Sequence, residues 1–190
     1  MNQEYNQKFY RKAIRLKDYD YSQPGAYFVT IVTQSRKCLF GKVDNGKMIL
    51  NEGGRMIEHV CREVEMTSPW LNLGSYQVMP NHIHLIINLG ESGFIDDKST
   101  DDRKTTINNG STQKSIHLSL FDVIGRIKSI STIRYIQGVR GNQWPMFDKR
   151  LWQRSYYDHV IRDEKDYEVI SEYILSNPMN WDKDEDYCVV

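Results

Sequence analysis

Alternating apolar and polar positions predict several short strands along the chain. Residues 26–33 combine β-branched and aromatic side chains after a Pro-Gly break, which is typical of a strand. Residues 44–46, Asp-Asn-Gly, separate two short apolar runs and predict a hairpin turn, because Asn and Gly tolerate positive φ. Further strands are expected at 75–79 and 82–89, with a short extended piece at 155–161.

Three other segments space their apolar residues as helices do. The first starts at Asn51, a residue type that caps helix N-termini well. The second starts at Leu118 and is closed by Gly138 and Gly141. The third starts at Asp163, with a carboxylate three residues later as in a capping box, and should stop at Asn177, because a residue before proline is pushed out of the α region. This order of elements predicts a small antiparallel or mixed sheet with helices packed on it.

Composition places the chain among single globular domains. It has 190 residues, of which 39% are hydrophobic and 26% charged, and residues 1–190 can therefore form one sizeable core. No apolar run approaches the roughly 18 residues that a membrane span needs, and residues 1–12 are too polar for a signal peptide. We therefore expect a cytoplasmic protein without a membrane partner. Residues 91–115 are almost entirely polar and predict a mobile loop.

The three cysteines, Cys38, Cys61 and Cys188, are far apart and form no C-x-x-C pair. An odd number at this spacing predicts neither a disulfide framework nor a thiolate zinc site. We expect three isolated, reduced thiols.

The formal net charge of zero hides a strong segregation of charge along the chain. Residues 115–162 carry eight basic and three acidic side chains, whereas residues 163–190 carry two basic and nine acidic ones. A polyanion responds to the field within about 10 Å at 0.1 M salt, so the basic segment could bind phosphate while the acidic one points elsewhere. The same charges are compatible with ordinary solvated surfaces.

The sharpest chemical signal is Met-Pro-Asn-His-Ile-His at residues 79–84. Side chains two apart in a strand share a face, so His82 and His84 are expected side by side, while Ile83 points to the other face. Two imidazoles in this arrangement can bind one cation. The alternative is a pair of histidines at the surface or across strands, and a third ligand and a reacting group are needed to decide.

Such groups occur on the last predicted helix. Tyr173 and Asn177 are four residues apart, so they lie about 40° apart around the helix and roughly 6 Å apart along its axis. A phenol and an amide oxygen would thus point toward one place, at a helix C-terminus whose partial negative charge favours a cation. The alternative for Tyr173 is a half-buried aromatic residue on an amphipathic helix.

Four stretches, in a common order, carry a resemblance to a known family. With them the chain resembles the REP-associated tyrosine transposases, relatives of the single-tyrosine transposases of small insertion sequences within the HUH endonuclease superfamily. The resemblance covers nearly the whole chain and departs from the family mainly in the long polar stretch 91–114. The stretches are Tyr19 to Thr33, Val78 to His84, Leu151 to Arg162, and Glu172 to Ile174 followed by Asn177, Pro178 and Trp181.

The resemblance implies an α+β fold: a single domain with a ferredoxin-like or RRM-like antiparallel sheet and helices packed on one side. It also implies that His82, His84 and Asn177 bind Mg²⁺ or Mn²⁺ and that Tyr173 is the catalytic nucleophile. The implied enzyme is a metal-dependent transposase and single-strand DNA endonuclease, which nicks and rejoins REP-like hairpins through a 5′-phosphotyrosine. His159 is a candidate helper for activating the phenol, whose ordinary pKa is near 10.

Two basic clusters are candidates for contacts with single-stranded DNA hairpins. One cluster lies near the N-terminus, at residues 11–15. In the other, at residues 150–154, basic and aromatic residues alternate as they do in grooves that bind single strands. The alternative interpretation places the tryptophan in the core and the cations in solvent. The candidates are Arg11, Lys12, Arg15, Arg150, Trp152 and Arg154.

Other functions are also compatible with the sequence. They are an initiator of replication or plasmid transfer from the same superfamily, a non-catalytic regulator that binds DNA hairpins, and an RNA-binding module. The complete set of His82, His84, Tyr173 and Asn177 favours the enzyme, because a binding protein has no need of all four. The residues leave open whether the chain acts as a monomer or a homodimer.

Overall fold

The computed structural model describes residues 16, 18–90, 119–184 and 186–188. The predicted mobile loop at 91–115 and the basic residues Arg11, Lys12 and Arg15 lie outside the described residues. None of the helices in the described ranges is long and apolar enough to cross a membrane.

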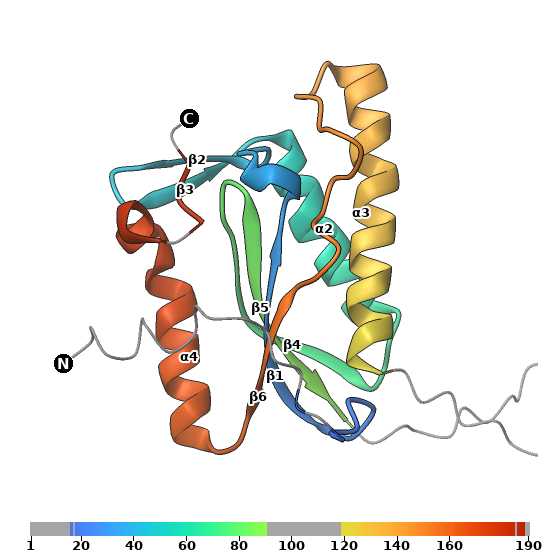
Figure 1. The fold of residues 1–190 in the computed structure, drawn as a ribbon, viewed down its shortest axis with the longest axis vertical. Coiled ribbons are helices and arrows are strands. Elements are labelled where there is room, and N and C mark those ends of the chain that lie inside the picture. Colours follow the sequence, from blue (N-terminus) through green and yellow to red (C-terminus); the bar gives the residue numbers. More distant parts are fainter. Residues whose placement is uncertain (1–15, 17, 91–118, 185, 189–190) are drawn as a thin grey trace, which may run out of the picture.

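A four-stranded antiparallel sheet forms the centre of the structure, with its strands in the order β4-β5-β1-β6 (Figure 1). β1 and β5 are its central strands, and Thr30 of β1 lies opposite His84 of β5. The strand bounds are β1 (Gly25–Val32), β4 (Leu71–Val78), β5 (His82–Leu89) and β6 (Tyr157–Ile161).

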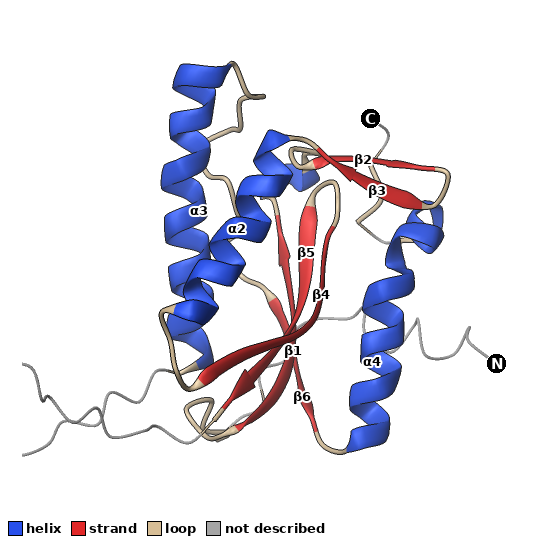
Figure 2. Cartoon of the chain, turned by 180° about the vertical axis from the view of Figure 1, so that it is seen from behind, coloured by secondary structure: helices blue, strands red, loops and turns tan. Residues whose placement is uncertain are grey.

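The two faces of the sheet are covered by different helices (Figures 1 and 2). Helices α2 (Glu52–Met66) and α3 (Leu120–Asn142) lie on one face and form the large core with every second residue of the central strands. Helix α4 (Glu164–Ser176) lies on the other face, where Phe28 and Ile86 form a smaller core with it.

The α+β class and the antiparallel sheet are confirmed, but the expectation that all helices pack on one side was wrong. α4 covers the face opposite to α2 and α3. The reason is visible in the central strands: Phe28 and Ile86 are apolar and point away from the large core, so they need a second layer to be buried.

The predicted hairpin is present as β2 (Gly41–Asp44) and β3 (Lys47–Leu50). Its turn residues Asn45 and Gly46 have φ values of 50° and 71°, the positive range for which Asn and Gly are suited. Strand β4 begins at Leu71, four residues before the predicted start. A register shift between Leu73 and Tyr76 breaks the alternation of its side chains, so the pattern of residues 71–74 does not indicate a strand.

Side-chain caps begin each of the three helices. The Asn51 side chain accepts a hydrogen bond from the Gly54 N–H, and Asp163 accepts one from the Asp166 N–H. α3 starts after Ser119, whose capping box with Asp122 was not anticipated, and ends at Asn142, one residue after Gly141.

The last helix ends at Ser176, one residue before the predicted stop, but the predicted reason for its end is wrong. Asn177 keeps α-helical angles, with φ −56° and ψ −41°, although Pro178 follows it. The chain then continues as the 3-10 segment η2 (Asn177–Lys183), which turns back toward the sheet. Pro178 is tolerated because the first turn of a helical segment does not need its N–H.

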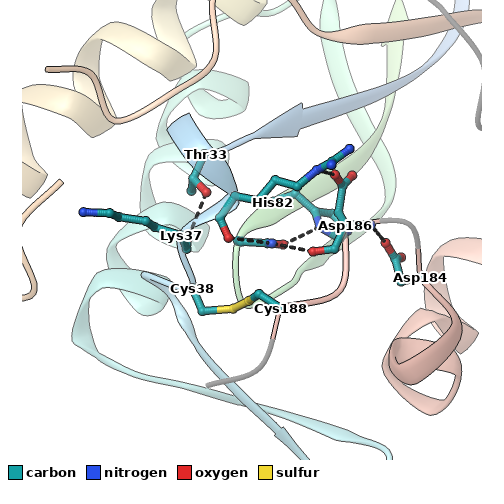
Figure 3. The surroundings of a disulfide bond; sticks show 9 residues. Thr33, Lys37, Cys38, His82, Asp184, Asp186 and Cys188 are labelled. Atoms are coloured by element: carbon teal, nitrogen blue, oxygen red, sulfur yellow. Dashed lines mark hydrogen bonds and ion pairs between the residues drawn. A yellow bond between two sulfur atoms is a disulfide. The ribbon is translucent and has the colours of Figure 1, made fainter. Parts of the chain in front are cut away.

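The expectation of three isolated thiols was wrong for two of the cysteines. Cys38 and Cys188 form a disulfide across a sequence separation of 150 residues, while Cys61 is free and buried in the large core. The chain after η2 returns to the segment that follows the 3-10 turn η1 (Gln34–Arg36), which brings the two cysteines together (Figure 3).

Candidate metal centre and nucleophile

Two histidines at the start of β5 form the centre of the candidate site. His82 and His84 are 0% and 3% exposed and lie on the face of the sheet that α4 covers. Their neighbours Ile83 and Leu85 point into the large core on the other face. The alternation of a strand therefore separates the chemistry of β5 from its packing, and the surface interpretation of the two histidines is excluded.

Hydrogen bonds set the orientation of both imidazoles. His82 Nδ1 lies 2.9 Å from Asn81 Oδ1. The amide nitrogen of Asn81 donates to two backbone carbonyls, those of Arg36 and Asp186, so its oxygen faces His82 and accepts the Nδ1 proton. His84 Nδ1 lies 2.8 Å from Thr30 Oγ1 on the neighbouring strand. This arrangement leaves the Nε2 lone pair of His82 available for a ligand.

The two Nε2 atoms face each other at 3.0 Å. Burial lowers the pKa of His82 to about 3, with Arg36 acting in the same direction. Burial also lowers the pKa of His84 to about 3, with His82 as the second cause. Both rings are therefore neutral near pH 7, the form in which imidazole binds metals. With the Thr30 hydroxyl accepting from His84 Nδ1, both Nε2 lone pairs point at one position.

A carboxylate completes the cluster. Ligand atoms of His82, His84 and Asp184 all lie within 4.8 Å of one another, and all three residues are buried. Burial raises the pKa of Asp184. One carboxylate oxygen, Oδ2, is buried without a hydrogen-bond partner. A buried oxygen with no partner is costly for a protein, and a bound cation would satisfy it.

Asn177 brings a second unsatisfied oxygen next to Asp184. It is the C-cap of α4, is 3% exposed, and its side chain interacts with the Asp184 carboxylate. Its Oδ1 atom is buried and has no hydrogen-bond partner. Two imidazole nitrogens and two unsatisfied oxygens form a donor set that fits a divalent cation with open coordination positions for a substrate.

Tyr173 lies beside the histidines on the last complete turns of α4. Its ring centroid is 5.4 Å from that of His84 and 6.0 Å from that of Phe28. The residue is half-buried, so one side of the ring packs on the sheet while part of the side chain reaches the surface. The structure thus brings together Tyr173, His82, His84 and, through Asp184, Asn177.

Trp152 is not a surface platform for DNA bases, and that expectation is corrected. It is 4% exposed, packs in the large core, and its Nε1–H donates to Ser131 Oγ at 2.9 Å. The alternative interpretation, which placed the tryptophan in the core, is correct. Burial of the large indole ring removes much apolar surface from water. Arg150 and Arg154 on either side of it are exposed, so their role in binding DNA stays a prediction.

His159 pairs with an acidic residue in the first turn of α4. It is on β6, and its Nε2 atom pairs with Asp166 Oδ2 at 2.9 Å. Asp166 is in the first turn of α4, seven residues or about 10 Å along the axis before Tyr173. A role for His159 as helper stays a prediction, and the observed geometry gives it a partner of its own.

Asp184 is the site residue that sequence reasoning missed. The acidic segment 163–190 was expected to point away from the phosphate-binding surface, and Asp184 is one acidic residue among nine there. It reaches the histidines only because η2 turns the chain back after Pro178. The only sequence feature that could have identified Asp184 is its position seven residues after Asn177. That spacing does not indicate proximity to the histidines unless the path of η2 is known.

No family model matches the chain. The chain is 35% identical over 191 residues to an uncharacterized protein of Haemophilus influenzae, and the match covers 98% of this chain and 99% of that protein. The chain belongs to the same family as this Haemophilus protein.

Two solved structures are similar to this chain. One is a REP-associated tyrosine transposase bound to a REP hairpin, with a TM-score of 0.49 and 20% identity, covering 86% of this chain and 72% of that one. The other, from Deinococcus radiodurans R1, is described as a proposed transposase and has a TM-score of 0.44 and 16% identity, covering 84% of this chain and 95% of that one. Similarity at this level does not establish a function for the chain. A proposal of function has to be argued from the side chains described above.

Proposed function

We propose that the protein is a single-tyrosine transposase of the HUH type, which nicks and rejoins single-stranded DNA at hairpins through a 5′-phosphotyrosine. The observation that carries this proposal is the convergence of two neutral imidazoles and two unsatisfied side-chain oxygens beside Tyr173. The sequence motifs that resemble the REP-associated transposases support it independently.

His82, His84 and Asn177 are the proposed ligands of Mg²⁺ or Mn²⁺, and Asp184 is a fourth. The donor set mixes imidazoles with amide and carboxylate oxygens, and its open positions would accept a phosphate oxygen. When bound, the ion would polarise the scissile phosphate and stabilise negative charge growing on its oxygens. Asn81 and Thr30 act on the ligands, because they hold the two imidazoles in the orientation that binding requires.

Tyr173 supplies the nucleophile in this proposal. Its phenolic oxygen forms a bond to phosphorus, the bond from phosphorus to the 3′-oxygen breaks, and the departing strand takes up a proton as a 3′-hydroxyl. The DNA 5′-phosphate stays on the tyrosine as an ester. Because one ester replaces another, a second 3′-hydroxyl can reverse the step and join a new strand without a nucleotide cofactor.

The partners that follow from this proposal are single-stranded DNA hairpins, and the compartment is the cytoplasm. The exposed Arg150 and Arg154 are proposed to contact DNA phosphates. A homodimer is compatible with the proposal but not required by it, because His82, His84, Asp184 and Tyr173 all come from one chain.

A covalent-adduct assay tests the proposal. The protein is incubated with labelled single-stranded hairpins from the DNA that flanks its own gene, with Mg²⁺ or Mn²⁺, and protein–DNA bands are separated on a denaturing gel. Tyr173→Phe should abolish the adduct and leave hairpin binding largely intact, because only the phenolic oxygen is removed.

Tyr167→Phe is the matched control, since Tyr167 is on the same helix and packs in the same small core. It should still form the adduct. Adduct formation by the Tyr173→Phe protein would eliminate the proposed nucleophile. Hairpin binding by the wild-type protein without any adduct would favour the non-catalytic regulator.

A further inference from the structure

The C-terminal segment lies across the candidate metal site and is held there at three points. Asp184 contributes to the ligand cluster, and Asp186 pairs with Arg36 at 2.6 Å. Cys188 is joined to Cys38 by the disulfide. Figure 3 shows Cys188 joined to Cys38, with Lys37, His82, Asp184 and Asp186 around the bond.

We propose that the Cys38–Cys188 disulfide is a redox latch that holds Asp184 in the metal site, so that the oxidised protein binds divalent cations more tightly than the reduced protein. This inference rests on the metal site of the proposed function. It goes beyond the proposed reaction, in which Cys38 and Cys188 take no part.

The first argument is the short connection between the disulfide and the ligand. Asp184 is four residues before Cys188, so the bond limits how far the carboxylate can move from the histidines. When the latch is closed, Asp184 is at a high effective concentration next to the cation. When it is open, the same carboxylate has to be ordered each time a cation binds.

The second argument is that the other attachments are weak by themselves. The ion pair between Arg36 and Asp186 has an arginine side chain that is 56% exposed, and exposed ion pairs contribute little to stability. The ring of Tyr187 contacts Trp181, but Tyr187 is 46% exposed. Loss of the disulfide should therefore free the C-terminal segment more than loss of either of these other contacts.

The third argument links the latch to a histidine. The Asn81 side chain donates to the backbone carbonyl of Asp186 at 2.6 Å, and its oxygen accepts from His82 Nδ1. The latched segment thus helps to hold the residue that orients His82. Opening the latch removes one ligand and loosens the support of another.

The redox step needs only a thiol reductant. A thiolate of the reductant attacks one sulfur of the Cys38–Cys188 bond, and its second thiol resolves the mixed disulfide. The two electrons pass from the reductant to the cysteines. Cys38 and Cys188 become thiols, and the reductant becomes a disulfide. Both cysteines are partly exposed and can be reached. Cys61 does not compete, because it is fully buried and burial raises the pKa of its thiol to about 12.

The proposed compartment makes a regulatory role more reasonable than a structural one. Disulfides in the cytoplasm of most organisms are transient and respond to the redox state. A four-stranded sheet with a large core under α2 and α3 has no need of a staple at its C-terminus. The bond instead joins the two segments that surround the metal site.

Titration with Mn²⁺ tests the inference, with the free ion followed by electron paramagnetic resonance. Oxidised full-length protein is compared with protein reduced by dithiothreitol, which is then removed by desalting without air. We expect the reduced protein to bind Mn²⁺ at least about 10-fold more weakly. A loss of this size is typical when the residues that orient metal ligands are removed. The double variant Cys38→Ser/Cys188→Ser should bind like the reduced protein and not respond to the reductant.

A second variant separates the latch from a general effect on folding. Asp184→Asn keeps the disulfide but removes the charged ligand, so it should bind Mn²⁺ weakly and respond to the reductant much less than the wild type, because only the support of His82 through Asn81 still depends on the latch. A redox dependence in Asp184→Asn as large as in the wild type would overturn the inference. So would equal Mn²⁺ affinity of oxidised and reduced wild-type protein, or free alkylation of Cys38 and Cys188 in protein exposed to an oxidant.

The same titration distinguishes failure of the inference from failure of the proposed function. Mn²⁺ binding that is lost in His82→Ala but does not depend on the redox state would overturn the latch and leave the metal site standing. Binding that is equal in wild type and His82→Ala would overturn the metal site, and the latch with it.

Discussion

The two faces of the central sheet have been given different tasks, although the same strands form both. On the face of α2 and α3, the central strands contribute apolar residues such as Val29, Ile83 and Leu85. On the face of α4, the neighbouring positions are Thr30, His82 and His84, with only a small apolar core beside them. One face supplies stability, and the other holds buried polar groups that cost stability unless they are satisfied.

This difference shows how a small domain can stay stable with polar groups buried in it. Removing polar groups from water requires that the rest of the molecule hold them in place. The large core on the far side of β1 and β5 does this through the backbone of those two strands, while α4 adds Tyr173 and Asn177 from above. The comparison can be tested by changing one face at a time.

The largest expected effect on stability comes from the apolar face. Leu85→Ala removes a fully buried side chain from the large core and should lower the free energy of unfolding by about 2–5 kcal/mol. Its neighbour His84 points to the other face, so His84→Ala should lower stability much less and remove Mn²⁺ binding. Urea unfolding and Mn²⁺ titration of the two variants measure both quantities. A Leu85→Ala protein that stays fully stable would break the division of tasks.

A pH-dependent loss of stability is expected from the polar face. In the metal-free protein, burial lowers the pKa values of His82 and His84 from 6.5 to about 3. The unfolded chain therefore takes up protons below pH 6.5 that the folded chain does not, so the stability present above pH 6.5 is lost as the pH falls toward 3. The loss is at most about 1.4 kcal/mol per pH unit for each histidine.

Urea unfolding in the presence of EDTA, at a series of pH values, measures this slope. His59→Gln, at an exposed position on α2, is the matched control and should keep the full slope. Replacing both His82 and His84 by Ala should flatten it. A slope that persists in the double variant would mean that other groups take up the protons.

The smallest expected effects compare the caps of one helix from each face. Asn51→Ala removes the cap of α2, and Asp163→Ala removes the cap of α4; each should cost about 1 kcal/mol. Only the second should also slow formation of the covalent DNA adduct, because α4 carries Tyr173. Equal adduct rates in the two variants would show that the position of α4 does not depend on its first turn.

Local features of this protein were well predicted because their causes are local. The turn at Asn45 and Gly46 follows from their tolerance of positive φ, and the start of α2 follows from the side chain of Asn51. The shared face of His82 and His84 follows from the geometry of any strand. Each of these needs only residues within a few positions of one another.

Features that depend on distant partners were predicted poorly. Trp152 and its basic neighbours had the composition of a DNA groove, but the tryptophan is buried against residues of α3. Cys38 and Cys188 gave no sign of pairing across 150 residues. In both cases the deciding partner is far away in the chain, and composition carries no information about the path between them.

By its own order of residues, the chain determined the elements, the caps, and the pairing of two imidazoles on one face of a strand. Tertiary structure alone decided that α4 covers the face of those imidazoles, that η2 turns Asp184 back to them, and that Cys188 meets Cys38. The physical reason is that burial is a collective property. Apolar positions such as Phe28 and Ile86 demand a covering layer, but which segment supplies it depends on how all the others have already packed.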